Sequence, residues 1–137
     1  MARTKKIVIA NEFRLTDQNG TLKALLSAGE QETIFSLKGD NQKDVIKLSV
    51  GSAGFSSLTF FDPADKERIQ LGIDDHGIHI HLAGDGKQQS YIFLKSNAAS
   101  GFVLTDVEGN RRVEAFIGPD SKPHVTIFPS GEEPKGL

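Results

Sequence analysis

Apolar and polar residues alternate along most of the chain, in short runs separated by glycine, aspartate, asparagine and proline. Phe13 to Asp17 is one such run, and Ile78 to Leu82 is another. A period of two sends successive side chains to opposite faces, as in a strand with one buried face. Turn residues recur roughly every 11 residues, a spacing typical of an all-β sandwich, barrel or trefoil. Because no amphipathic helix of useful length is present, the pattern predicts an all-β fold of short antiparallel strands.

One pattern occurs three times and organises the chain. It reads apolar-x-apolar-x-Asp-x-x-[Gly/Asp]-x-x-[Lys/Arg]-apolar-x-apolar, and its copies are centred on Asp17, Asp62 and Asp106. These aspartates are 45 and 44 residues apart, and a recurrence at one period is the signature of a structural repeat. We therefore expect a single all-β domain over residues 1–137, with repeats at about 7–51, 52–96 and 97–131 and a tail at 132–137.

Each copy predicts a tight turn between two strands. An aspartate at the first turn position can accept hydrogen bonds from backbone N–H groups with its carboxylate. Gly20 and Gly109, three residues further on, can take the positive φ that a type I turn with a bulge requires. Asp65 replaces glycine in the second copy, and aspartate tolerates that region better than most residues.

Three repeats of about four strands each suggest pseudo-threefold symmetry. A β-trefoil fits the repeat and chain lengths, and a three-sheet β-prism or a meander of stacked hairpins fits nearly as well. A fainter second hairpin follows each aspartate turn, and this half-repeat of roughly 22 residues favours the stacked hairpins. The alternation pattern leaves these three architectures open.

The alternation also places apolar residues on the nominally wet face. Counting from Phe13, Leu58 and Phe102 puts Leu25, Phe61, Val103 and Phe116 outside, together with Arg14, Thr16, Thr59 and Thr105. Either a second sheet of the same chain covers these residues, or they meet another subunit. On the second interpretation, Phe61, Val103 and Phe116 form the interface of a homo-oligomer.

The motif that begins Phe13-x-Leu15-x-Asp17-x-x-Gly20, with its copies at Asp62 and Asp106, resembles uncharacterised bacterial proteins built of F-x-L-x-D-x-x-G-x-x-R/K hairpin repeats. The resemblance covers roughly residues 7 to 131, and because its motif is structural it implies no catalytic or binding residues. The third copy departs from the pattern at Pro119, Pro123 and Pro129.

Composition and charge narrow the range of functions. The chain has no cysteine, which excludes disulfides, thiolate chemistry and Cys-ligated zinc. Its net charge is −2, with 16 basic and 18 acidic residues, so we expect neither a nucleic-acid nor a membrane partner. The apolar stretch after the basic N-terminus is too short for a signal peptide, and the default expectation is a cytoplasmic protein. No catalytic motif is assembled, and we expect no enzyme and no cofactor.

The strongest chemical candidate is the segment from His76 to His81. His79 and His81 share a strand face, close enough for both imidazoles to reach one metal ion. The alternative is that Ile78 and Ile80 are buried and the histidines simply face solvent. A metal-dependent enzyme at this strand is therefore the third of three functional hypotheses.

The recurring basic residues give the second hypothesis. Lys23, Arg68 and Arg112 follow the three aspartate turns and could bind a carbohydrate or small anion, or could merely pair with neighbouring acids. The turn aspartates lack the spacing of an EF-hand loop. The leading hypothesis remains a non-enzymatic binding or structural module that self-associates through an apolar strand face.

Overall fold

The computed structural model describes residues 7–129 and the backbone of residues 135–136, and these residues form strands and turns without a helix. The all-β prediction is confirmed. The strands are β1 (Glu12–Thr16), β2 (Leu22–Ala28), β3 (Glu32–Lys38), β4 (Asp44–Gly51), β5 (Ser56–Phe61), β6 (Glu67–Asp74), β7 (Gly77–Ala83), β8 (Gln89–Lys95), β9 (Ser100–Thr105), β10 (Arg111–Ile117), β11 (Pro123–Ile127) and the two-residue β12 (Lys135–Gly136).

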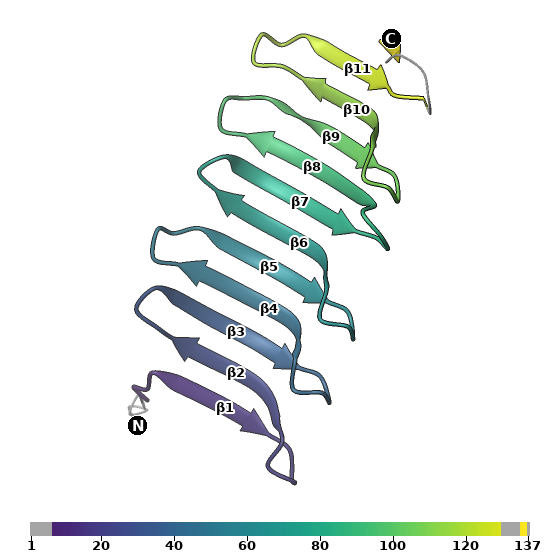
Figure 1. The fold of residues 1–137 in the computed structure, drawn as a ribbon. Helices are drawn as coiled ribbons and strands as arrows, with labels where there is room; N and C mark the ends of the chain where they lie inside the picture. The colour runs from purple at the N-terminus through teal and green to yellow at the C-terminus, as the bar shows by residue number, and fades with distance from the viewer. Residues whose placement is uncertain (1–6, 130–134, 137) are drawn as a thin grey trace, which may run out of the picture.

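The strands form one open antiparallel sheet in which every strand pairs with its neighbours in the sequence (Figure 1). The order runs from β1 to β12 without a crossover, so the fold is a simple meander of hairpins. The described residues do not close into a trefoil or a prism, because no strand pairs or packs outside this consecutive order. Sequence periodicity cannot distinguish a closed array of hairpins from an open one, since both need the same strands and turns.

The hairpin of about 22 residues is the repeating unit of the sheet. At one margin, five turns share the same backbone hydrogen bond from the first residue to the fifth, at 17–21, 39–43, 62–66, 84–88 and 106–110. Aspartate opens the first, third and fifth of these turns, whereas Gly39 and Gly84 open the other two. The 44–45-residue spacing therefore marks every second hairpin. The expected tail at 132–137 lies outside the described residues apart from the backbone of 135–136.

The predicted chemistry of the aspartate turns is confirmed. Asp17 Oδ1 accepts hydrogen bonds from the N–H groups of Asn19 and Thr21, at 2.9 and 3.0 Å. Asp62 and Asp106 accept the equivalent pairs in their own turns. Gly20, Asp65 and Gly109 adopt φ values of 79°, 69° and 89°, and a register shift in each hairpin marks the bulge.

The register gives the sheet two chemically different faces. One row of directly paired residues crosses the whole sheet and is apolar at every position: Phe13, Leu26, Phe35, Leu48, Leu58, Leu71, Ile80, Ile92, Phe102, Ala115 and Val125. We call the face that carries this row the apolar face. The opposite face, which we call the second face, carries Arg14, Ser36, Lys47, Thr59 and Gln70, in line with the predicted alternation.

The sheet is a single layer, and few of its side chains are buried. The three buried apolar residues among those described are Ala24, Phe93 and Ala99. The accessible surface is 10058 Å², against roughly 7,000 Å² for a compact monomer of this mass. The chain thus exposes about 3,000 Å² more than such a monomer. The described residues include no helix that could span a membrane.

Candidate functional site

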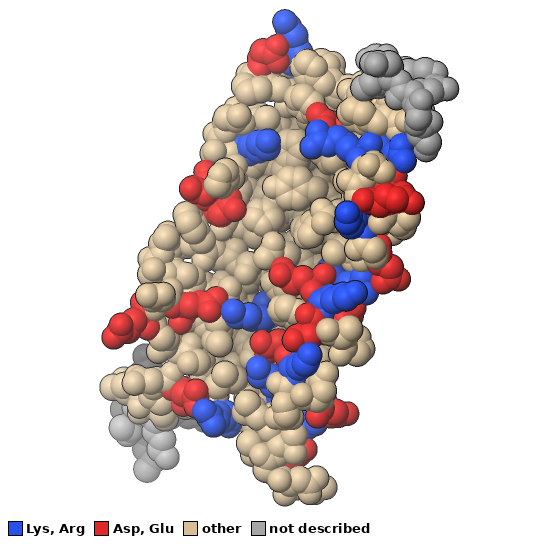
Figure 2. Space-filling model, viewed as in Figure 1, with Lys and Arg blue, Asp and Glu red and all other residues tan. Residues whose placement is uncertain are grey.

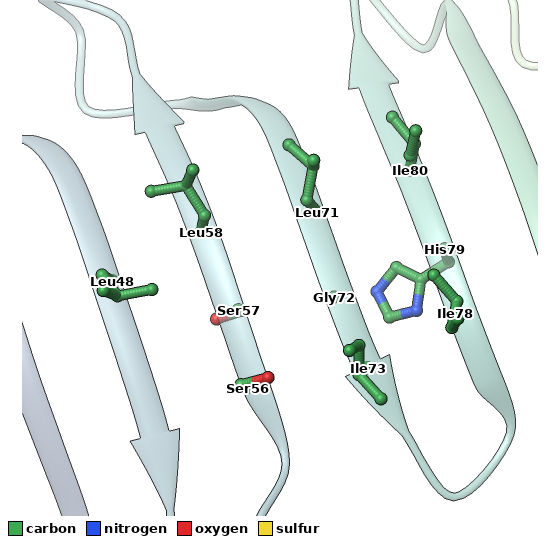
Figure 3. A pocket seen from close by; sticks show the side chains of 10 residues that line it. All are labelled: Leu48, Ser56, Ser57, Leu58, Leu71, Gly72, Ile73, Ile78, His79 and Ile80. Carbon is green, nitrogen blue, oxygen red and sulfur yellow. The ribbon is translucent and has the colours of Figure 1, made fainter.

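The apolar face is not covered by any other part of the chain that the structure describes. Figure 3 shows its centre, where Leu48, Leu58, Leu71 and Ile80 stand side by side on β4 to β7. Ile73 and Ile78 form a second row beside them. These side chains line a shallow hollow of about 310 Å³.

The exposure of this face is extensive rather than scattered. Leu15 is 65% exposed at one end of the sheet, and Leu94 is 57% exposed far along it. Leu71 in the centre is still 40% exposed. Contiguous apolar patches beyond a few hundred Å² are rare on soluble monomers and mark interaction surfaces. The apolar face can therefore bind another apolar surface by excluding water.

The second face is more closely packed, and two glycines on it leave room for atoms of the neighbouring strands. A Cβ on Gly72 would lie 2.4 Å from His79 Nε2, and a Cβ on Gly101 would lie 2.4 Å from Phe116 Cβ. At Gly72 the ring of His79 occupies the space that a side chain would take. At Gly101 that space is taken by the neighbouring strand itself, since a Cβ there would also lie 2.3 Å from the backbone oxygen of Ala115. Further along, Tyr91 stacks with Phe93 at a centroid distance of 5.7 Å.

The three predicted interface residues lie on the second face and do not form one cluster. Val103 and Phe116 line the same hollow, over β9 and β10. Phe61 lies at the end of β5, beside Val45 and Pro63 in a different hollow. The alternation correctly assigned them to the face opposite Leu58. No second sheet of the described chain covers either face, so intramolecular burial on both faces, the other interpretation of these residues, was wrong.

The predicted ligand-binding residues Lys23, Arg68 and Arg112 are held in ion pairs. Lys23 Nζ donates to Asp40 Oδ1 at 2.8 Å, and Arg68 bridges Asp62 and Asp85 at 2.7 and 2.9 Å. Arg112 Nε donates to Asp106 Oδ2, as Arg68 Nε donates to Asp62 Oδ2. In the view of Figure 2, such charges gather along the margins of the sheet, over the turns. An anion at these residues would have to displace an aspartate.

These ion pairs also shift the titration of the turn carboxyls. Partial burial raises the pKa of Asp106, but the Asn110 N–H and the Arg112 guanidinium outweigh it and lower that pKa to about 2. The Thr21 N–H lowers the pKa of Asp17, and the Lys66 N–H lowers that of Asp62. The three carboxylates are therefore structural caps that stay ionised well into acid.

The predicted metal ligands His79 and His81 share the second face, as expected, but they are not joined by further donors. His79 packs over Gly72, and its nearest carboxylate oxygen is Asp74 Oδ2, 4.0 Å from Nδ1. Among the described residues, the one group of three close donors is Asp74, Asp75 and His76. Asp74 Oδ1 there accepts hydrogen bonds from the N–H groups of the turn. Because Asp74 already holds the backbone of the turn, these three residues fit a structural role better than a metal site.

Sequence reasoning missed the aromatic part of the second face. Tyr91, Phe93 and Lys95 alternate along β8 and therefore share that face. The signal was present in the spacing, since Ile92 and Leu94 occupy the apolar positions between them. The missing information was the register, which pairs Tyr91 with Val103 on β9 and Val103 in turn with Glu114 on β10.

Comparison with protein-family models and with curated protein sequences finds no match to this chain.

Proposed function

We propose that this chain is a non-enzymatic structural or binding module whose copies associate through the apolar face. The observation that carries the proposal is the single-layer sheet, which leaves one apolar face uncovered along its full length. Two copies together would carry about 6,000 Å² of excess surface, which is more than enough to supply the 2,000–5,000 Å² that the two partners of an obligate homo-oligomer bury between them. A second copy of the chain is the occupant that matches this face, because it offers an equally long and equally apolar surface.

Two kinds of assembly between copies would cover the apolar face. Two sheets packed face to face make a sandwich with a core about 10 Å thick. Three sheets arranged around an axis make a three-sided prism, so the pseudo-threefold arrangement expected of one chain would arise between chains. In both assemblies the second face points outward and stays available to a further ligand.

The proposal includes no catalysis. The described residues bring together no nucleophile with a base, and the three closest metal donors belong to an exposed turn. A module of this kind acts by binding a partner or by forming an assembly, and it catalyses no reaction itself.

Native mass spectrometry and sedimentation velocity of the untagged protein test the proposal. We expect a dimer or a trimer, and a monomer at high concentration would contradict it. Leu71→Asp puts a charge into the centre of the apolar face, while Gln70→Asp puts the same charge on the second face one residue away. Burying the exposed 40% of Leu71 is worth about 1 kcal/mol per copy. Leu71→Asp should therefore weaken association at least ~tenfold, and Gln70→Asp should not.

The interface first expected from the sequence is a separate arm of the same experiment. Phe61→Ser alters the second face and leaves the apolar face intact. If Phe61→Ser gives monomers while Leu71→Asp stays assembled, the copies associate through the second face and the assignment of the interface is wrong.

A further inference from the structure

The second face contains a hollow of about 340 Å³ whose lining is both aromatic and polar. It lies over β8, β9 and β10, and its floor is made by Tyr91, Phe93, Val103 and Phe116. This volume is at the lower end of the range for small-molecule sites. The other hollows described above are lined mainly by aliphatic side chains or by turn residues.

The rings of the floor are held in place before any ligand arrives. Tyr91 and Phe93 stack with 28° between their planes, and Phe93 is 8% exposed. Phe116 stacks on His124 at a centroid distance of 4.8 Å. Gly101, between Phe93 and Phe116 in the register, leaves the space that the Phe116 side chain occupies. Such a floor loses little conformational entropy when a flat molecule settles on it.

The rim of the hollow carries both hydrogen-bond donors and a carboxylate acceptor. Lys95 Nζ lies 5.0 Å from the centroid of the Phe93 ring. Arg111 pairs with Glu114 at the opposite side of the hollow. Asn97 Oδ1 accepts a hydrogen bond from the Ala99 N–H at 3.2 Å, so its amide nitrogen is left to donate.

We propose that this hollow binds a neutral carbohydrate, about one or two sugar rings in size. A pyranose presents a flat C–H face that packs on aromatic rings, and its hydroxyl groups both donate and accept hydrogen bonds. That combination matches rings flanked by the ammonium of Lys95, the amide of Asn97 and the carboxylate of Glu114. A nucleic acid would use the same rings, but Arg111 on the rim is already paired with Glu114, which leaves Lys95 as the rim cation for phosphates on a chain of net charge −2.

The site is independent of the proposed assembly. The floor and rim lie on the second face, so the hollow stays open when the apolar face is covered. It is also distinct from Lys23, Arg68 and Arg112, whose charges are already paired at the turns. Self-association and sugar binding can therefore succeed or fail separately.

Fluorescence of Tyr91 can report directly on ligand binding in this hollow. The chain has one tyrosine, Tyr91, and no tryptophan, so its intrinsic ultraviolet fluorescence reports on the floor of the site. The protein would be titrated with maltose, cellobiose, lactose and N,N′-diacetylchitobiose up to about 20 mM, a range that captures millimolar affinities. An oligothymidylate in the same assay tests the nucleic-acid alternative.

We expect a saturable change of the Tyr91 emission with at least one of the sugars. Phe116→Ala removes one ring from the floor and should weaken that binding roughly threefold to tenfold. Glu114→Gln should weaken it, whereas Glu12→Gln, which alters the ion pair with Arg14 elsewhere on the sheet, should leave it unchanged. Circular dichroism of each variant checks that the sheet is intact.

Three results would overturn the proposal. The first is a flat response to all four sugars. The second is a response to the oligothymidylate that exceeds every sugar response. The third is conversion of Phe116→Ala to monomers in the sedimentation assay, because the hollow would then be a contact between subunits.

Discussion

Gly20 offers a clean test of the turn geometry that organises the sheet. Its φ is 79°, and a Cβ built on it would meet no atom within 4 Å. Gly20→Ala therefore adds a methyl group to open space, and the backbone angle is the sole source of strain. An alanine in the left-handed region costs about 1–2 kcal/mol. Alanine also restricts the unfolded chain, which stabilises the folded state by about 0.4–1 kcal/mol. The net loss of stability should therefore lie between about 0 and 1.6 kcal/mol, with a midpoint of about 0.8 kcal/mol.

Urea unfolding followed by circular dichroism measures this loss, at one fixed protein concentration because association contributes to the apparent stability. For a chain of 137 residues, 1 kcal/mol corresponds to a fall of about 3–5 °C in Tm. Gly20→Asn is the matched control, since asparagine enters the left-handed region more readily and should lose less. If Gly20→Ala is more stable than the wild type, or at least as stable as Gly20→Asn, residue 20 does not adopt this angle and the turn assignment fails.

Two further predictions concern the stability of the sheet. Ser36 on the second face is fully buried, and its hydroxyl has no hydrogen-bond partner among the described residues, so Ser36→Ala should leave the free energy of unfolding unchanged or raise it by up to about 1 kcal/mol. Ser49→Ala is its control, because it breaks the 3.0 Å hydrogen bond to Ser57 and should destabilise by about 1 kcal/mol; the opposite ranking in urea would contradict the assignment. The lowered pKa values of Asp17, Asp62 and Asp106 mean that their stabilisation is present above the unfolded-state pKa of 3.8 and is lost as the pH falls toward 2. The triple Asp→Asn variant should therefore show a flatter stability profile between about pH 4 and 2 than the wild type, and parallel profiles would exclude these carboxylates as the cause.

Local features of the fold could be predicted from the sequence because they depend on local physics. Alternation around Phe13 and Ile78 identified strands, and the spacing from Asp17 to Gly20 identified a bulged turn with positive φ. Those inferences need a few consecutive residues and the preferences of each residue type. The same inferences assigned Val103 and Phe116 to the face opposite Leu58.

The number of layers could not be predicted, because alternation states which residues share a face and not what covers that face. The repeat at Asp17, Asp62 and Asp106 left a trefoil, a prism and a meander of stacked hairpins open, because an open meander uses the same turns as a closed array. The aromatic hollow was missed for a related reason. Tyr91 and Glu114 become neighbours of Val103 through the register of three strands, and register depends on pairings that a single strand does not encode.

The connectivity of the sheet explains why its apolar face needs a partner. Each strand of the described chain contacts just the strands before and after it, as in a solenoid. No contact among the described residues therefore links β2 to β10 directly, and each hairpin can open with little effect on distant ones. A second sheet lying across the apolar row would contact many strands at once. Association would then supply both the missing buried surface and the coupling between hairpins that a single layer lacks.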